Sequence, residues 1–250
     1  MKKTIRLLLL LAVLGLVGAS AALHPILPMR LVGGIAFLLS VTLLASFTRF
    51  FSLRYWRQGS CGILSGGPEP GAWAPDFILK TTEGRFVSLR DLRARKPVAL
   101  VTGSYSCPAF RGSSGRLEEL HSRYGDRVAF LILYTVEAHP EGSQRPYSGS
   151  GGKKAAGRNR DDGIFVTQPQ KYEERVKTAA QCRDALSLDI TVAIDDMDNQ
   201  VWVAYGSAPN AAYLIDRRGK VIARHGSFHP PTFEESIKRC LSGLAPIKWT

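Results

Sequence analysis

The stretch Pro97-Val-Ala-Leu-Val-Thr-Gly-Ser-Tyr-Ser-Cys107-Pro108-Ala-Phe-Arg111 joins an apolar run to a cysteine and a proline. The run from Val98 to Val101 predicts a strand, and Pro108 fits the first turn of a helix, where its missing N–H costs nothing. Cys107 therefore falls at a helix N-terminus, where unpaired N–H groups and the helix dipole favour a thiolate. We predict a nucleophilic thiol there; a buried structural cysteine is the alternative.

Cysteine usage narrows the kinds of site that the chain can hold. The four cysteines are Cys61, Cys107, Cys182 and Cys240. They lie far apart, and no two of them form a CxxC pair. This spacing argues against a zinc site and against a dense disulfide scaffold, so we expect no bound metal.

The chain is strongly basic, with a formal net charge of +12 over 250 residues. Such a charge can indicate nucleic-acid binding, but no recognisable nucleic-acid motif accompanies it. Much of the excess lies near the apolar N-terminal segments and in the stretch 142–163. We therefore expect attraction to anionic lipid headgroups, or simple solubility, and no nucleic-acid partner.

Two apolar runs at the N-terminus predict membrane segments. The first extends from Ile5 to Leu23 and the second from Leu31 to Phe47, which is about the minimum length for a span. Either both runs span as a hairpin, or the first is a signal peptide cleaved near Ala19-Ser-Ala21. In both cases the positive-inside rule places the rest of the chain in the cytoplasm. A single uncleaved anchor that exports the domain is a third option.

These features predict how the chain is divided. Residues 1–58 form one or two N-terminal transmembrane helices, residues 59–71 a linker, residues 72–244 the soluble domain and residues 245–250 a tail. The linker is assigned from its Gly, Ser and Pro content. The expected location is the inner or plasma membrane.

The soluble domain alternates short strands with helices. Strands are predicted at 73–79, 86–89, 98–101, 126–134, 189–195, 208–216 and 221–224. Helices are predicted at 88–92, 115–124, 169–188, 201–206 and 233–241. This order predicts an α/β fold with a mixed β-sheet flanked by helices.

Polar residues follow the strand that ends at Tyr134. Glu137 and His139 flank a small residue at strand spacing, which puts both on one face. Because parallel strands joined by a helix end at the same edge of a sheet, we expect both residues near Cys107. A hydrogen-bonded histidine with no catalytic role is the alternative for His139.

The stretch 142–163 is cationic and of low complexity, and it predicts a flexible basic loop. A long loop beside a site is either a lid or disordered, and we expect disorder. The helix predicted after it carries Cys182. The sequence leaves open whether this thiol lies near Cys107 or has no role.

Several motifs resemble the thioredoxin fold in its peroxiredoxin-like form. They are Ala74-Pro-Asp-Phe77, Val87-Ser-Leu89, Lys96-Pro-Val98, Cys107-Pro108 and Tyr213-Leu-Ile-Asp-Arg-Arg-Gly219. In such folds a cis proline faces the reactive cysteine. The resemblance implies this role for Pro209, which precedes the last of these motifs.

More specifically, residues 73–241 resemble the iodothyronine deiodinase family. The motifs are Gly103-Ser-Tyr-Ser-Cys-Pro-Ala-Phe110, Tyr134-Thr-Val-Glu-Ala-His-Pro140, Tyr172-Glu-Glu-Arg-Val-Lys-Thr-Ala-Ala180 and Asp195-Asp-Met-Asp-Asn199. Cys107 stands where the family has selenocysteine, and Glu137 and His139 stand at its acid–base segment. The family has a further histidine, which grips the hormone, at a position that corresponds to about Pro169 here, so this sequence lacks it.

The resemblance implies a membrane-anchored thiol oxidoreductase. Its Cys107 would attack iodine on an aromatic ring while His139 and Glu137 deliver a proton to carbon, as in thyroxine deiodination. No bound cofactor is implied; an external thioredoxin-like or glutathione-like thiol reductant regenerates the enzyme. Supporting roles fall to Ser104, Ser106, Pro108 and Pro209. The implied partners are an iodinated aromatic or other small electrophile, the thiol reductant and the membrane, with a homodimer as a further option.

Two other functions remain open. A peroxiredoxin-like peroxide reductase would use Ser104, three residues before Cys107, and Cys182 as the resolving thiol. A non-catalytic membrane protein of redoxin shape would use the basic loop 142–163 as a docking surface.

Overall fold

The computed structural model describes residues 66–142, 146 and 150–244. The predicted membrane segments, most of the predicted linker and the tail 245–250 lie outside these residues. Within the described ranges, no helix is both long and apolar enough to cross a bilayer.

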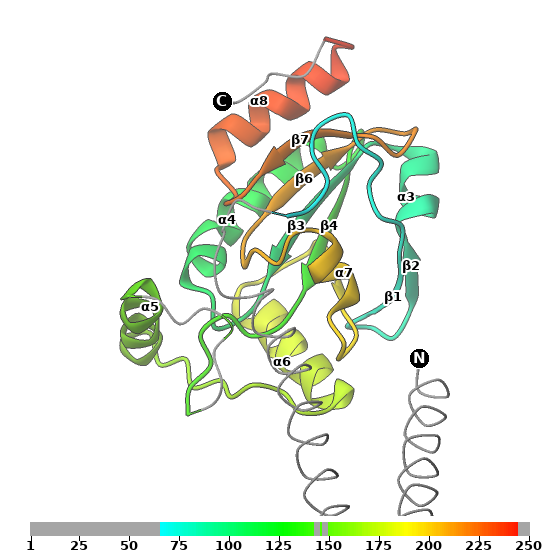
Figure 1. Cartoon of the computed structure of the whole chain (residues 1–250). Coiled ribbons are helices and arrows are strands. Elements are labelled where there is room, and N and C mark those ends of the chain that lie inside the picture. The colour runs from blue at the N-terminus through cyan, green and yellow to red at the C-terminus, as the bar shows by residue number, and fades with distance from the viewer. Residues whose placement is uncertain (1–65, 143–145, 147–149, 245–250) are drawn as a thin grey trace, which may run out of the picture. The chain divides into compact units, whose positions relative to one another are not determined.

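In this part of the chain, seven strands form one mixed sheet in the order β2-β1-β5-β4-β3-β6-β7 (Figure 1). The three central strands, β5, β4 and β3, are parallel, and antiparallel strands extend the sheet on both sides. The strands are β1 (Ile78–Thr81), β2 (Phe86–Ser88), β3 (Val98–Gly103), β4 (Ala129–Tyr134), β5 (Thr191–Ile194), β6 (Ala212–Ile215) and β7 (Val221–His225).

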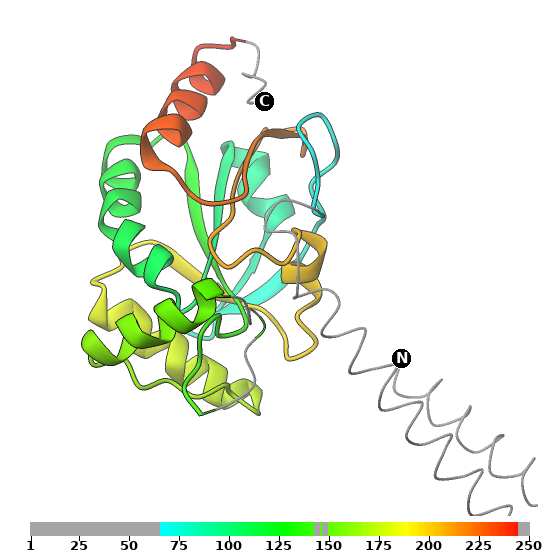
Figure 2. The ribbon, with the colours of Figure 1, turned by 60° about the vertical axis from the view of Figure 1, so that its left-hand side comes forward.

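Helices cover both faces of the sheet, giving three layers (Figures 1 and 2). The helices are α3 (Leu89–Arg95), α4 (Pro108–Tyr124), α5 (Ser150–Asp161), α6 (Tyr172–Ala185), α7 (Gln200–Ala204) and α8 (Pro230–Leu241). One buried cluster joins the sheet to α4, α6 and α8, and a second joins its other face to α3 and the end of α7. The predicted mixed α/β sheet is confirmed.

The central strand β3 shows why the sheet is buried on both faces. All six of its residues are buried, and successive side chains point to opposite faces. Ala99 and Val101 belong to the cluster that includes α4, whereas Val98 and Leu100 belong to the cluster that includes α3. A central strand that is covered on both faces therefore requires a continuous apolar run such as the one in β3.

Helix α4 begins earlier than the sequence pattern suggested. The predicted helix started at Gly115, but α4 begins at Pro108, with Cys107 as its N-cap residue. The prediction that Pro108 occupies the first helical turn is confirmed. The Gly-Ser-Ser-Gly run from residue 112 concealed this first turn because these residues have low helix propensity.

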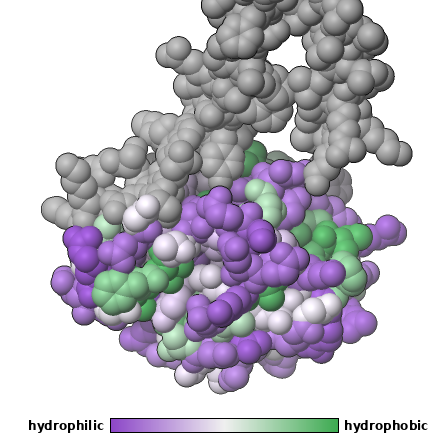
Figure 3. Space-filling model, turned by 90° about the horizontal axis from the view of Figure 1, so that it is seen from below, coloured by the Kyte–Doolittle hydropathy of each residue, from purple (hydrophilic) through white to green (hydrophobic). Residues whose placement is uncertain are grey.

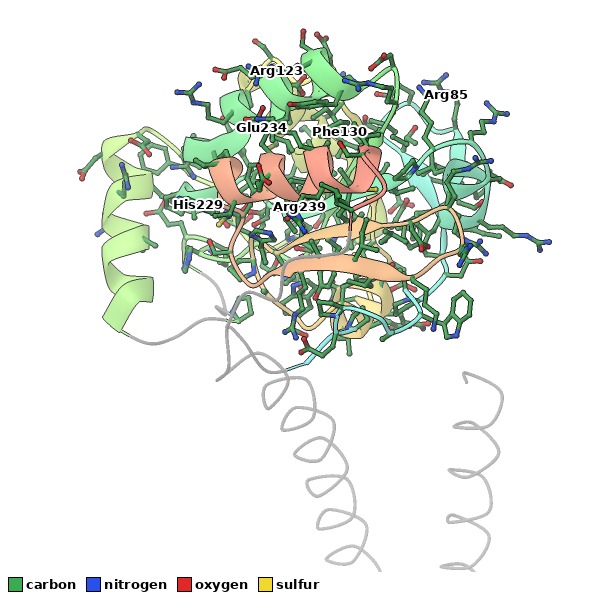
Figure 4. All side chains as sticks on the ribbon, turned by 90° about the horizontal axis from the view of Figure 1, so that it is seen from above. Arg85, Arg123, Phe130, His229, Glu234 and Arg239 are labelled. Atoms are coloured by element: carbon green, nitrogen blue, oxygen red, sulfur yellow. The ribbon has the colours of Figure 1, made fainter. Side chains whose placement is uncertain are left out.

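The far end of α4 is tied to α8. Glu234 of α8 accepts hydrogen bonds from the guanidinium of Arg123 and the hydroxyl of Tyr124, both at 2.7 Å. Figure 4 shows Arg123 and Glu234 facing each other from the two helices. This contact lies at the end of α4 opposite to Cys107.

The expectation of a flexible loop over residues 142–163 was wrong for most of its length. Residues 150–161 form helix α5. The helix ends in a motif in which Ile164 N–H bonds to Asn159 C=O and Gly163 N–H to Arg160 C=O, with Gly163 at φ +71°. The glycine-rich composition of this segment predicts no helix. Contacts with residues distant in sequence, such as Arg111, hold it instead.

The expectation of a cis proline at position 209 was also wrong, because the Ala208–Pro209 peptide bond is trans. The carbonyl of Ala208 is held by the Thr102 hydroxyl at 2.9 Å and the Trp202 indole N–H at 3.3 Å. The Thr102 hydroxyl also accepts the Ala211 N–H at 2.8 Å. These bonds fix the turn before β6 with the intrinsically favoured trans isomer.

Gly103 ends β3 where the structure has no room for a side chain. A Cβ atom at this position would lie 2.5 Å from two ring atoms of Phe110. Because Phe110 lies in the first turn of α4, its displacement would disturb the segment that carries Cys107. We expect Gly103→Ala to lower the free energy of unfolding by about 1–3 kcal/mol, measured by urea denaturation.

Gly115 provides the matched control for this substitution. It lies within α4, and a Cβ there would meet nothing within 4 Å. Gly115→Ala is expected to leave stability unchanged or raise it by up to about 1 kcal/mol, since alanine favours helix. Equal destabilisation by both substitutions would contradict the steric argument.

Candidate active site

Three parallel strands end level with one another at the edge that carries the site. Gly103 of β3 pairs with Tyr134 of β4, and Tyr134 pairs with Ile194 of β5. The chain beyond these strand ends supplies Cys107, Glu137 and Asp195. The expectation that Glu137 lies near Cys107 is confirmed, because the N–H of Ser106, the residue before Cys107, donates to the Glu137 carboxylate at 2.7 Å. Figure 3 views the molecule from this side, where the surface is mostly hydrophilic with separate apolar patches.

The Cys107 thiol lies at the N-terminus of α4 and is 1% exposed. Burial raises the pKa of the thiol, because a thiolate loses solvation in an apolar site. The N–H groups of Ala109 and Phe110 lower this pKa, although Cys107 makes no capping hydrogen bond. The predicted helix-terminus effect is thus present, but burial outweighs it in this conformation.

Glu137 is fully buried and held by two donors. The Ser106 N–H donates to its Oε2 at 2.7 Å, and the Tyr134 hydroxyl donates to its Oε1. Burial raises the pKa of Glu137, while both hydrogen bonds lower it. A buried carboxyl beside a thiol can exchange a proton with reacting groups at near-neutral pH.

Ser104 and Ser106 attach the loop after β4 to the turn before α4. The Ser104 hydroxyl oxygen accepts the Ala138 N–H at 3.1 Å, and that of Ser106 accepts the His139 N–H at 3.0 Å. These bonds give both serines a structural role. Donation to the Cys107 thiolate and proton relay by the His139 ring stay predictions.

Cys182 of α6 lies in the same core cluster as Cys107 and is 1% exposed. Burial raises its pKa well above the usual value, and the nearby charges of Glu137 and Cys107 raise it further. The two thiols therefore lie in one electrostatic environment. Pro209 lies in the turn before β6, where the Thr102 hydroxyl holds the preceding Ala208 carbonyl. Its supporting role at the site stays a prediction.

Four further residues of this site were not predicted from the sequence. Tyr134 holds Glu137 from the last position of β4, and the Gln168 side chain brackets the Glu137 backbone at 2.9 and 3.2 Å. Arg111 and Asn159 join α4 to α5 beside the thiol. Tyr134 and Arg111 stood within the quoted motifs, at the strand end and in the first helical turn; Asn159 and Gln168 carried no sequence signal.

A buried acidic group follows β5. The Asp195 carboxylate accepts the N–H of Trp202 at 2.7 Å and that of Asp196 at 2.9 Å, and so holds the start of α7. Burial raises the pKa of Asp195 to about 6. The buried Arg175 side chain donates to the Asp195 and Asp196 carbonyls. This network supports the site edge from the side of β5.

Within the described residues, no group of three or more His, Cys, Asp or Glu side chains is arranged to hold a metal ion.

The family model described as Iodothyronine deiodinase matches residues 64–241. Thyroxine 5-deiodinase of Sparus aurata is 28% identical over 162 residues, covering 62% of this chain and 54% of that protein. Type II iodothyronine deiodinase of Bos taurus is 28% identical over 158 residues, covering 61% and 53%. The chain spans about half the length of the curated relatives it matches.

Solved structures share the fold at low sequence identity. A presumed protein disulfide isomerase from Bacteroides thetaiotaomicron has a TM-score of 0.51 at 17% identity, covering 72% of this chain and 95% of its own. An uncharacterized conserved protein from Geobacillus kaustophilus has a TM-score of 0.53 at 16% identity, covering 73% and 87%. These likenesses support the thioredoxin-like arrangement of sheet and helices.

The charge of Glu137 is one cause of the raised pKa of Cys107. Removing a nearby negative charge favours the thiolate, so Glu137→Gln should lower the pKa of the thiol. We expect the pH midpoint of Cys107 alkylation by iodoacetamide to move to lower pH in this variant. Glu141→Gln, a change of the same type on the same loop, is the control and should keep the wild-type midpoint. A Glu137→Gln midpoint that stays or rises would contradict the electrostatic coupling.

Proposed function

The chain belongs to the iodothyronine deiodinase family, and on this premise we propose that it is a thiol oxidoreductase that removes iodine from an aromatic substrate. The observation that carries the proposal is the burial of the Cys107 thiol and the Glu137 carboxyl together at adjoining strand ends. A nucleophile and a proton donor in one dry site are the two groups that this reaction needs.

In the proposed first half-reaction, the Cys107 thiolate forms an S–I bond as the C–I bond of the substrate breaks. The aromatic carbon keeps the bonding electron pair and takes up a proton. The substrate is thereby reduced by two electrons, and the sulfur is oxidised to a sulfenyl iodide. Glu137 is the proposed source of the proton, because burial raises its pKa. His139, two residues further along the same loop, is the proposed relay to solvent.

The second half-reaction restores the thiol. An external thiol attacks the Cys107 sulfur, releases iodide and a proton, and leaves a mixed disulfide. A second thiol of the reductant then attacks the reductant sulfur of this mixed disulfide, which frees the Cys107 thiol and leaves the reductant oxidised to a disulfide. A thioredoxin-like or glutathione-like reductant supplies these electrons, and no bound cofactor is required.

Cys182 offers an internal alternative for this step. As the resolving thiol it would attack the oxidised Cys107 sulfur and form a Cys107–Cys182 disulfide, which the external reductant then opens. The burial of both thiols in one core cluster supports this route. It also favours a second candidate function, peroxide reduction, in which Cys107 is oxidised to a sulfenic acid before Cys182 resolves it.

The substrate and the location are proposed from the relatives and from the sequence. The relatives named above are thyroxine and iodothyronine deiodinases, so iodinated phenols, thyroxine among them, are the substrate class to test. The apolar runs at 5–23 and 31–47 support a membrane anchor with a cytoplasmic domain. A homodimer remains part of the proposal.

Turnover should depend on Cys107. With dithiothreitol as reductant, we expect the full-length chain to release iodide from iodinated phenols, and Cys107→Ser to reduce this rate by at least about 10³-fold. Cys240→Ser, at a half-buried thiol of α8, is the control and should keep the wild-type rate. Equal rates in Cys107→Ser and wild type would exclude Cys107 as the nucleophile.

Peroxide treatment tests the role of Cys182. With one equivalent of hydrogen peroxide, we expect peptide mapping by mass spectrometry to detect a Cys107–Cys182 disulfide. In Cys182→Ser, Cys107 should instead accumulate as a sulfenic acid that dimedone labels. Wild-type chain that also accumulates the sulfenic acid, without the disulfide, would remove Cys182 from both proposed routes.

A further inference from the structure

Helix α5 is bonded to both loops that carry the proposed catalytic residues. The side-chain N–H₂ of Asn159 donates to the Ser106 carbonyl at 2.9 Å and to the His139 carbonyl at 3.1 Å. Its Oδ1 accepts from the Arg111 guanidinium at 3.0 Å. One amide thus joins the turn before α4, the loop after β4 and the first turn of α4.

The burial of these groups distinguishes an inner part of the contact from an outer part. Asn159 is 4% exposed, so its polar atoms depend on these three bonds. The Arg111 side chain is 9% exposed and also donates to the Tyr105 carbonyl at 2.7 Å. Asp162 pairs with Arg111 at 2.6 Å but is 46% exposed. Arg111, Asn159 and Asp162 are called the α5 clasp below.

The position of Asp162 is a second, independent observation. It directly follows the last residue of α5, where a negative charge opposes the helix dipole. An acidic residue is locally unfavourable there, and its pairing with Arg111 offsets that cost. The C-terminal end of α5 is therefore suited to meet α4 rather than solvent alone.

The bonds of Asn159 reinforce links that hold the reacting groups. Ser106 already connects the two loops, because its N–H bonds to Glu137 and its hydroxyl accepts the His139 N–H. Asn159 binds the carbonyls of the same two residues, Ser106 and His139. Hydrogen bonds to the N–H groups and to the carbonyls of Ser106 and His139 thus both fix the spacing between the turn that carries Cys107 and the loop that carries Glu137 and His139.

We propose that Asn159 is a positioning residue of the active site, which holds the Glu137–His139 loop at its working distance from the Cys107 turn. The proposal rests on the proposed function and adds α5, a segment outside the motifs of the family resemblance, to the catalytic machinery. Asn159 acts through the backbone of other residues and does not touch the reacting atoms. Asp162, as the exposed member of the α5 clasp, contributes little.

Four variants of the full-length chain separate these roles. Asn159→Ala removes all three bonds, and Asn159→Asp keeps the acceptor for Arg111 but removes both donors. Asp162→Asn removes the outer ion pair. Asp161→Asn makes the same charge change at the neighbouring exposed residue and is the matched control. Thermal unfolding of each variant sets a temperature at which all of them are folded.

We expect both Asn159 variants to lower kcat for iodide release by about 10- to 100-fold, with KM within about 3-fold of wild type. The amide hydrogens of Ala138 and His139 should exchange with deuterium about 10-fold faster, because their loop is loosened. Asp162→Asn should stay within about 3-fold of wild type in kcat, and Asp161→Asn should equal it.

The exchange measurement separates failure of this proposal from failure of the proposed function. If the wild-type chain released no iodide from any iodinated phenol, the proposed function would fall, but amide exchange at residues 138–139 would still decide the role of Asn159. Asn159 variants that lower only the Tm, with wild-type kcat and wild-type exchange at these residues, would overturn the proposal. If Asn159→Ala does not fold, the nearly isosteric Asn159→Asp carries the test.

Discussion

The hydrogen bond from the Ser106 N–H to the Glu137 carboxyl is the constraint on which the site depends. A fully buried carboxyl is costly unless donors satisfy it, and Ser106 and Tyr134 supply these donors from the ends of two neighbouring strands. The requirement couples the turn that carries Cys107 to the loop that carries His139. Because β3 and β4 end level with each other, the turn and the loop lie close enough for this bond. Because the carboxyl is buried, losing the bond would leave it without one of its two donors.

The same burial sets up a competition for charge. Cys107 and Glu137 each have a pKa raised by desolvation, and the charge of Glu137 raises the pKa of Cys107 further. A site of this kind favours one negative charge over two. Loss of the thiol proton is therefore easiest when Glu137 holds a proton, and a protonated carboxyl is also the state required to donate to an aromatic carbon. The electrostatics that disfavour an isolated thiolate thus favour the pair of protonation states that the proposed deiodination requires.

Local sequence patterns were sufficient to predict most of the sheet and the proximity of Cys107 and Glu137. The apolar run before Cys107 and the Pro108 position predicted the strand and the helix start, and parallel topology then placed Glu137 beside the thiol. Two expectations failed where long-range contacts decide. The peptide bond before Pro209 is trans, in a turn that is held by the hydroxyl of Thr102, a residue distant in sequence. Helix α5 is held by Arg111, so composition alone could not predict it.

Helix α5, which the sequence pattern did not predict, has a physical consequence for the thiol. The positive charge of Arg111 lowers the pKa of both Cys107 and Cys182, against the effect of burial. An arginine in a first helical turn could equally extend into solvent, where water would screen its charge. Asn159 and the Tyr105 carbonyl keep it covered and close to the sulfur atoms instead. If Cys107 is the nucleophile, as proposed, its site is dry enough to oppose thiolate formation, and Arg111 supplies part of the compensating charge. Helix α5, which lies outside the quoted family motifs, holds Arg111 in place.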